Sequence, residues 1–183
     1  MLQSIILPFT TILVAELLDK SQLALILLST KTKHHLQLIL GALLAFALVD
    51  GAAILFGSVL VSIIPELYIK IAAALTFFYF GITSLRAKEE KADKITSGKN
   101  AFLSALSVIF LSEWGDKTQI ASAVFATRFP PFAVFIGVML AMLVLAVLAV
   151  YLGKLLDKKI PAQTIRKVAG ILFILLGVVF LII

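Results

Sequence analysis

Two polar runs of similar composition interrupt long apolar stretches of this chain, and they contain the residues best suited to chemistry. Residues 16–22 read ELLDKSQ, and residues 113–119 read EWGDKTQ. Each run places two carboxylates, a lysine, a hydroxyl and an amide among residues suited to hydrocarbon. Because ionisable groups inside a bilayer are costly, they indicate a functional site. Their repetition favours a cation pathway built by gene duplication.

The paired runs predict a binding site made of oxygen atoms. On a helix each residue advances by about 100°, so positions 16, 19 and 22 form one stripe and positions 113, 116 and 119 form a second. The predicted metal ligands are Glu16, Asp19, Gln22, Glu113, Asp116 and Gln119, with Ser21, Thr118, Asp50, Lys20 and Lys117 as auxiliary residues. Oxygen ligands suit hard divalent cations such as calcium, magnesium and manganese. Zinc and copper sites more often use His or Cys.

A charge count connects this site to proton exchange. The four motif carboxylates contribute −4 and the two motif lysines contribute +2, so one divalent cation would neutralise the remaining charge. When the ion leaves, protons can neutralise the same groups, because closely spaced acids in a poorly solvated place are difficult to keep ionised together. A site that alternates between a metal ion and protons is the physical basis of cation–proton antiport.

The composition indicates a membrane protein. The 183 residues are 62% hydrophobic and 14% charged, with a mean hydropathy of +1.15, whereas a soluble domain is about 45–50% apolar. The net charge of +6 does not indicate nucleic-acid binding, because the basic residues lie where membrane topology places them. The chain has no cysteine, which excludes disulfides and thiolate metal sites. Its first residues lack the basic region of a cleaved signal peptide.

Six segments are long enough to cross about 30 Å of hydrocarbon as helices. They cover residues 4–29, 36–64, 67–85, 101–127, 132–152 and 162–183. Their apolar residues run continuously instead of alternating, which argues against transmembrane strands. We therefore predict an all-α integral membrane protein with six transmembrane helices.

The sequence is also an internal duplication. Residues 9–31 align with 106–128 at an offset of 97, and one deleted residue then reduces the offset to 96. Residues 1–86 form the first predicted three-helix repeat, residues 87–105 a charged cytoplasmic linker, and residues 106–183 the second repeat. Because three helices per repeat is an odd number, the second repeat must enter the membrane from the opposite side. The prediction is a 3+3 inverted repeat, an architecture that recurs in secondary transporters with the substrate at the repeat interface.

The distribution of basic residues predicts the orientation. With both termini outside, the cytoplasmic loops and linker contain most of the lysines and arginines, whereas the external loops contain Lys70 and Arg128. Cytoplasmic loops of membrane proteins carry such an excess of Lys and Arg. We therefore expect a multi-pass protein of the cell membrane whose two acidic motifs face each other in antiparallel helices.

The roles of some motif residues have more than one interpretation. Each Glu–Lys pair at i, i+4 could neutralise itself, which would make the motifs structural salt bridges. The lysines could balance charge, hold the carboxylates in place or extend to the membrane interface. Asp50, which Ala146 replaces in the second repeat, could be a fifth acid in a proton path or the partner of Lys20 or Lys117.

The motifs resemble those of a known family, the small Gdt-type manganese/calcium–proton antiporters, whose members carry two copies of Glu-x-Gly-Asp-(Lys/Arg)-(Ser/Thr). Residues 113–118 match throughout, and residues 16–21 match except that Leu18 replaces glycine. The helix count, the charged central segment and the repeat fit as well, so the resemblance covers essentially the whole chain. It implies that Glu16, Asp19, Glu113 and Asp116 bind the ion. It also implies export of manganese or calcium, driven by inward proton movement.

The functional prediction is a secondary transporter, not an enzyme, that exports a divalent cation in exchange for protons, with manganese ahead of calcium. Its predicted partners are the lipid bilayer, the cation and protons, and no cofactor is expected. A homo-oligomer is possible. An alternative is an exporter of a cationic organic solute such as a basic amino acid. A channel and a magnesium-dependent intramembrane enzyme are further alternatives, although the sequence shows no clear nucleophile or phosphate loop for the enzyme.

Overall fold

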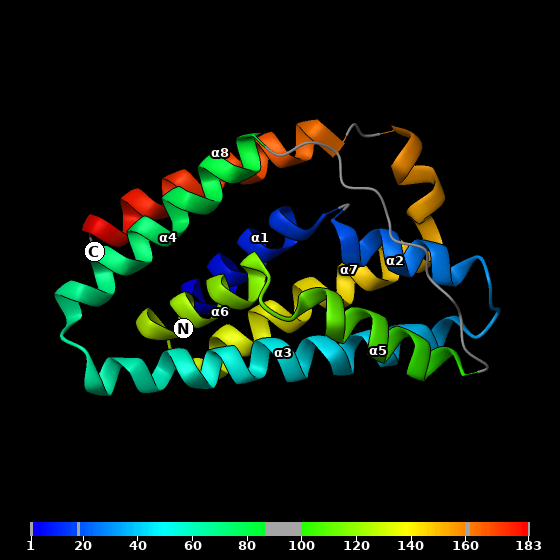
Figure 1. Ribbon diagram of the computed structural model, residues 1–183, viewed down its shortest axis with the longest axis horizontal. Helices are drawn as coiled ribbons and strands as arrows, with labels where there is room; N and C mark the ends of the chain where they lie inside the picture. Colours follow the sequence, from blue (N-terminus) through cyan, green and yellow to red (C-terminus); the bar gives the residue numbers. More distant parts are fainter. Residues whose placement is uncertain (1, 18, 87–99, 160–161, 183) are drawn as a thin grey trace.

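The computed structural model describes residues 2–17, 19–86, 100–159 and 162–182, and every regular element in these ranges is a helix (Figure 1). The helices are α1 (Gln3–Glu16), α2 (Lys20–Ser29), α3 (His35–Ile63), α4 (Glu66–Arg86), α5 (Ala101–Glu113), α6 (Lys117–Arg128), α7 (Pro131–Lys159) and α8 (Ala162–Ile182). Four of the predicted segments correspond to α3, α4, α7 and α8, although α7 continues to Lys159. Leu18 and most of the predicted linker 87–105 lie outside the described residues.

The prediction of single helices across 4–29 and 101–127 is wrong, because each segment is interrupted at its acidic motif. Helix α1 ends at Glu16 and α2 begins at Lys20, while α5 ends at Glu113 and α6 begins at Lys117. The stripe of positions 16, 19 and 22 on one continuous helix therefore does not exist, and neither does its counterpart. Asp is among the residues preferred immediately before a helix, where its side chain can accept bonds from free backbone N–H groups.

The apolar surface of the helices is that of a membrane protein. Within the described ranges, three stretches are long and apolar enough to cross a membrane: His35–Leu60, Leu67–Arg86 and Pro131–Tyr151. Helices α1, α2, α5 and the Gly170–Ile182 part of α8 are shorter apolar helices. Leucines such as Leu40, Leu44 and Leu48 on α3 are exposed, as side chains facing lipid would be.

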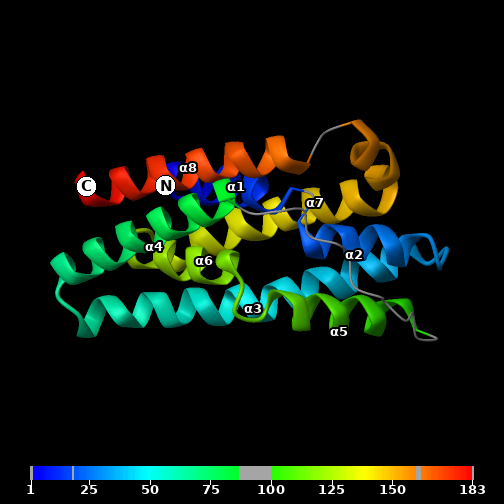
Figure 2. The same cartoon turned by 45° about the horizontal axis from the view of Figure 1, so that its top comes forward.

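The helices pack in pairs that correspond between the two halves of the sequence. Helix α1 packs against α7 and α5 against α3, and α4 packs against α8, as both views show (Figures 1 and 2). Glycines allow the close approaches: a Cβ at Gly41 would clash with the carbonyl oxygen of Phe102, and one at Gly137 with that of Ile5. Gly41 and Gly137 are equivalent in the duplication, so the two clashes occupy matching positions.

A buried aromatic cluster joins the α4–α8 pair to α6. The ring of Phe77 lies 5.6 Å from Phe125, 5.9 Å from Phe173 and 5.2 Å from Phe180, measured between centroids. Such pairs add to the stability that burial of the rings provides. The cluster fixes the second half of the interrupted α5–α6 segment, and so helps to position the acidic motif at its start.

Candidate cation-binding site

The two interruptions have nearly the same backbone conformation at the first and last residues between the helices, Leu17 and Asp19 in one and Trp114 and Asp116 in the other. Leu17 has φ −62° and ψ 121°, and Trp114 has φ −64° and ψ 114°. Asp19 and Asp116 then lie at the N-caps of α2 and α6, with ψ of 176° and 165°. Gly115 has a φ of 81°, in the left-handed region that glycine adopts at little cost. The first motif thus breaks its helix at the same place as the second, although it lacks the glycine.

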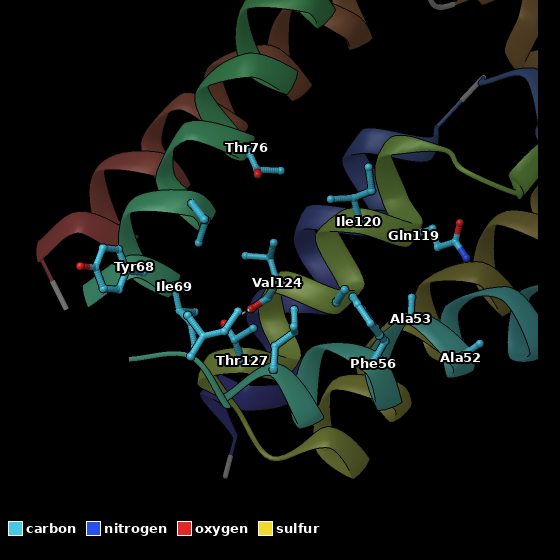
Figure 3. Close-up of a pocket in the computed structure, with 15 residues that line it drawn as sticks. Ala52, Ala53, Phe56, Tyr68, Ile69, Thr76, Gln119, Ile120, Val124 and Thr127 are labelled. Carbon is cyan, nitrogen blue, oxygen red and sulfur yellow. Dashed lines mark hydrogen bonds between the residues drawn. The ribbon is translucent and has the colours of Figure 1, made fainter. Parts of the chain in front are cut away.

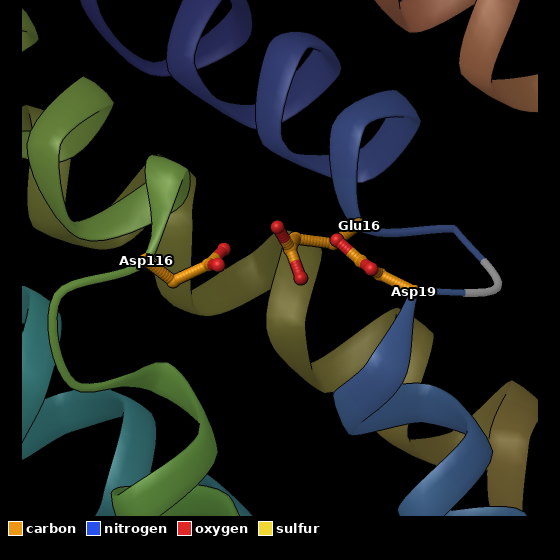
Figure 4. A group of neighbouring side chains, drawn as sticks. All are labelled: Glu16, Asp19 and Asp116. Atoms are coloured by element: carbon orange, nitrogen blue, oxygen red, sulfur yellow. The ribbon is translucent and has the colours of Figure 1, made fainter. Parts of the chain in front are cut away.

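Three carboxylates meet where the two interruptions face each other. Glu16, Asp19 and Asp116 each offer an oxygen atom within 4.8 Å of the others, and Figure 4 shows these side chains pointing toward a common space. Glu16 is completely buried and Asp19 is 9% exposed. Oxygen atoms on opposite sides of a calcium ion are about 4.6–5.2 Å apart, so the cluster has the dimensions of a divalent-cation site.

The polar contacts of the site cross from one motif to the other. The Thr118 hydroxyl donates a hydrogen bond to Glu16 Oε1, and Lys117 Nζ contacts an oxygen of Asp19. Lys20 Nζ is 2.9 Å from Asp116 Oδ1. The lysines therefore bridge the two interruptions, in contrast to the interpretation in which each Glu–Lys pair neutralises itself within its own motif.

The fourth motif acid lies beside this cluster. Glu113 is 2% exposed and is close enough to Glu16, Asp116 and Asp50 for their charges to interact. Ser21, the repeat-related counterpart of Thr118, lies near Glu113, but its hydroxyl has no hydrogen-bond partner among the described residues. Glu16 Oε2 and Glu113 Oε1 are buried and have no hydrogen-bond partner among the described residues. Buried acceptors without partners are costly, and a bound cation or proton would satisfy them.

Asp50 adds an acid from a third element, α3. It is 2% exposed, and its Oδ1 accepts a hydrogen bond of 2.9 Å from the Ser122 hydroxyl on α6. The charges of Glu16 and Asp116 also act on it. Asp50 is therefore a buried acid beside the motif acids, and its role in a proton path stays a prediction.

The two motif glutamines, which we predicted to act alike, have different surroundings. Gln22 is 2% exposed, and neither atom of its amide has a hydrogen-bond partner among the described residues. Gln119 instead accepts a hydrogen bond of 2.7 Å from the Gly115 backbone N–H, and its Nε2 lies 3.5 Å from the Val49 carbonyl oxygen. The amide of Gln22 is therefore available for a ligand, whereas that of Gln119 is engaged with the backbone of its own motif.

The helix interruption is the feature that the predicted continuous spans 4–29 and 101–127 missed, although its signal was present. An N-cap residue followed three positions later by Glu or Gln is typical of a helix start. Asp19 and Gln22 have this spacing, as do Asp116 and Gln119. The Gln119 side chain indeed reaches back to a backbone N–H just before α6. The long apolar segments on both sides of each motif instead favoured the prediction of one continuous helix.

Two interrupted apolar helices that bring buried acids together define a class of protein, the membrane transporters of cations. Interrupted helices in these proteins place polar chain ends and carbonyl groups beside the substrate ion. Here Asp19 and Asp116 occupy the N-cap positions of α2 and α6, and both belong to the cluster. The oxygen-only chemistry of the acids is that of a hard cation site.

The chain belongs to the GDT1 family: the family model, described as "Divalent cation/proton antiporter GDT1", matches residues 4–92 and 101–183. A Vibrio cholerae protein named "Putative manganese exporter" is 29% identical over 92% of this chain and 85% of its own length. GDT1-like protein sll0615 of Synechocystis is 27% identical over 92% and 91% of the two chains. GDT1-like protein 3 of Oryza sativa subsp. indica is 28% identical over 89% and 68%. No solved structure matches the chain.

Family membership confirms the resemblance inferred from the two motifs. The protein is a transmembrane transporter of divalent cations, and its family is one of transporters.

Proposed function

We propose that this protein is a secondary transporter that exports Mn²⁺, and Ca²⁺ second, from the cytoplasm in exchange for protons. The observation that carries the proposal is the convergence of carboxylate oxygen atoms of Glu16, Asp19 and Asp116 within 4.8 Å of one another. These possible ligand atoms come from both interruptions. Together with Glu113, these three acids are the proposed ion ligands. Gln22 supplies a further amide oxygen, and Gln119 can do so once it releases Gly115. The name of the Vibrio cholerae relative supports manganese as the first choice.

The proposed architecture is a 3+3 inverted repeat in which each interrupted segment counts as one span. The corresponding helix pairs and the matched clashes at Gly41 and Gly137 support it. Contacts between α4 and α8 also occupy equivalent positions of the two repeats. Gly81 lies against Ile174 and Gly177 against Phe78, and both pairs are related by the offset of 96. The excess of Lys and Arg in the proposed cytoplasmic loops supports external termini. In this arrangement the ion lies between the repeats, which move relative to each other to change access.

Proton exchange follows from the charges gathered at the site. Four motif acids and two lysines leave two negative charges, which a divalent ion neutralises while it is bound. When the ion departs, buried carboxylates without hydrogen-bond partners need protons in its place. An ion and protons therefore bind in alternation, which couples their movements in opposite directions.

Asp50 is the proposed additional proton carrier. Its carboxylate lies near Glu16 and Asp116, and it is held by Ser122 on α6. Because it is outside the three-acid cluster, it can exchange a proton with the site without occupying an ion ligand position.

The alternative of a cationic organic solute predicts a larger apolar pocket beside the acids. A cavity of about 610 Å³ does lie between α3, α4 and α6, with Phe56, Tyr68 and Gln119 among its lining residues (Figure 3). None of the four motif acids lines it. The groups that would hold an ammonium are therefore separate from the space that would hold the rest of the solute, and the divalent cation is the better-supported substrate.

Transport by purified protein in proteoliposomes tests the proposal. Vesicles with an acidic interior and a pH-sensitive dye are mixed with Mn²⁺, and protein molecules whose cytoplasmic face is outward should take up Mn²⁺ while releasing protons. The metal and proton signals should rise together and saturate. Saturable uptake without proton release would contradict antiport, and competition by arginine or lysine but not Ca²⁺ would favour the organic-solute alternative.

Binding is measured separately from transport. Saturating Mn²⁺ should raise the thermal stability of the detergent-solubilised protein, because a ligand at 100 times its Kd stabilises the folded state by about 2.7 kcal/mol. Comparison of Mn²⁺, Ca²⁺, Mg²⁺ and Zn²⁺ gives the preference. Equal stabilisation by all four ions would contradict a selective site.

A further inference from the structure

Lys117 has a position that the motif alone does not explain. Its ammonium contacts an oxygen of Asp19 and lies 3.4 Å from Glu16 Oε1 and 3.6 Å from Asp116 Oδ2. These are the same three acids whose oxygen atoms converge within 4.8 Å. The positive charge of Lys117 thus lies in the space that the three carboxylates enclose.

The equivalent lysine of the first motif is placed differently. Lys20 Nζ contacts Asp116 through Oδ1, whereas Lys117 approaches the same carboxylate through Oδ2. The side chain of Lys20 is 38% exposed, and that of Lys117 is 22% exposed. Lys20 therefore approaches Asp116 from the more open side, and the two lysines are not interchangeable despite their matching positions in the repeat.

A divalent cation bound by these oxygen atoms needs the space that the Lys117 ammonium takes. Metal–oxygen distances of about 2.0–2.6 Å would bring the ion almost into contact with Nζ, and like charges repel strongly at such separations away from bulk water. The ammonium and the ion cannot both stay. The lysine stem is long and flexible, and its partial exposure gives the ammonium a way out of the cluster.

We propose that Lys117 is an internal competitor for the transported ion: its ammonium takes the place of the cation between Glu16, Asp19 and Asp116 and swings outward when the ion binds. The inference rests on the proposed ion site. Displacement of an ammonium lowers the affinity for the ion, which favours release after transport. Lys117 is thus an affinity-setting residue, while Lys20 holds Asp116 in position from outside.

The test compares Mn²⁺ binding by the full-length protein and three variants, measured by isothermal titration and thermal shift. Lys117→Met keeps the length of the side chain and removes the charge, so we expect Kd to fall by about tenfold or more. Lys117→Arg keeps the charge, so its Kd should stay close to that of the natural protein. Lys20→Met removes the same charge from the repeat-related position and should change Kd much less.

The outcomes separate this inference from the proposed function. If the natural protein binds no Mn²⁺, the proposed function fails. If it binds Mn²⁺ and Lys117→Met binds equally or more weakly, Lys117 is not a competitor. Equal tightening in Lys117→Met and Lys20→Met would show a general effect of net charge and would also overturn the assignment.

A second measurement uses the unaltered protein and does not depend on the folding of a variant. An amine-specific acylating reagent is applied at increasing Ca²⁺ or Mn²⁺, and labelling at each lysine is quantified by peptide mass spectrometry. Lys117 should become more reactive as the site fills, while labelling of Lys20 changes less. Unchanged or reduced labelling of Lys117 at saturating ion would overturn the proposal.

Discussion

The two helix interruptions occur at the same place in each motif but differ in their surroundings. At the first, Asp19 is 9% exposed and Gln22 is 2% exposed, so the polar residues lie in the interior. At the second, Trp114 is 61% exposed and Gly115 is also exposed. The local fold follows from the repeated pattern, whereas the exposure of its side chains depends on what packs around it. The second interruption is the more open of the two.

The neighbouring helices extend this difference. Asp50 on α3 is hydrogen-bonded to Ser122 on α6, but the equivalent positions in the other repeat are Ala146 and Leu25, both almost fully buried. An acid and a hydroxyl on one side correspond to two apolar groups on the other. Duplication can therefore supply the four-acid site, while divergence supplies an additional acid on one side.

The largest expected effect tests what the two interruptions share. Glu16→Gln and Glu113→Gln should each lower Mn²⁺ transport by about 100-fold or more, because each removes a buried negative charge opposite the ion. Proteoliposome flux measures this loss, and Glu66→Gln at the start of α4 is the control outside the motifs. Full transport by either motif variant would remove that residue from the site and break the equivalence of the two halves.

The next prediction concerns the acid that is present on one side. Asp50→Asn keeps the shape and the contact with Ser122 but cannot bind or release a proton at neutral pH. We expect Mn²⁺ binding to persist, whereas proton release during uptake falls strongly, as paired metal and pH recordings would show. Ser122→Ala leaves the carboxyl group in place and should have a weaker effect. Unchanged proton coupling in Asp50→Asn would assign the protons to the four motif acids alone.

Matched substitutions at the helix contacts test the symmetry of the fold. Gly41→Ala and Gly137→Ala should each lower the free energy of unfolding by about 1–3 kcal/mol, because each Cβ meets the backbone of a neighbouring helix. Gly51→Ala is the control, since the nearest atom to its Cβ is an aromatic carbon of Phe135 at 3.6 Å. Thermal unfolding in detergent gives the comparison. A loss of stability in only one of the variants Gly41→Ala and Gly137→Ala would argue against equivalent packing at the two positions.

The smallest effect distinguishes the two motifs themselves. A Cβ at Gly115 would meet nothing within 4 Å, so Gly115→Ala changes only the backbone preference. At a φ of 81° the expected cost is about 1–2 kcal/mol, and Gly115→Asn should cost less because Asn tolerates this conformation better. Unfolding measurements on both variants test the order. A stabilised Gly115→Ala variant would show that the interruption does not require glycine in the second motif either.

Much of this site could be predicted from the sequence, because the acids occur twice in an otherwise apolar chain. Glu16, Asp19 and Asp116 do converge, and Glu113 lies beside them. The prediction that the acids form a stripe along one continuous helix was wrong. Hydrophobicity indicates where a chain is buried but not where a helix stops. The N-cap spacing between Asp19 and Gln22 was a weaker local signal than the apolar residues that flank the motif on both sides.

The contacts between the two motifs could not be predicted. The sequence offered three roles for each lysine, and the choice depends on which carboxylate lies within a few ångströms of each ammonium. The pairing of Lys20 with Asp116 and of Lys117 with Asp19 arises because two chain segments 97 residues apart meet in space. The difference between Gln22 and Gln119 likewise depends on the neighbouring backbone.

The sequence by itself determined that this chain is helical, that it lies in a membrane and that its repeated acids offer oxygen ligands of the kind that hard cations prefer. Those properties follow from composition, repetition and the chemistry of single side chains. Only the tertiary structure decided where the helices stop, which acids share one space and which lysine enters it. Such properties depend on the relative positions of distant segments, and electrostatic contacts of this kind change greatly over a few ångströms.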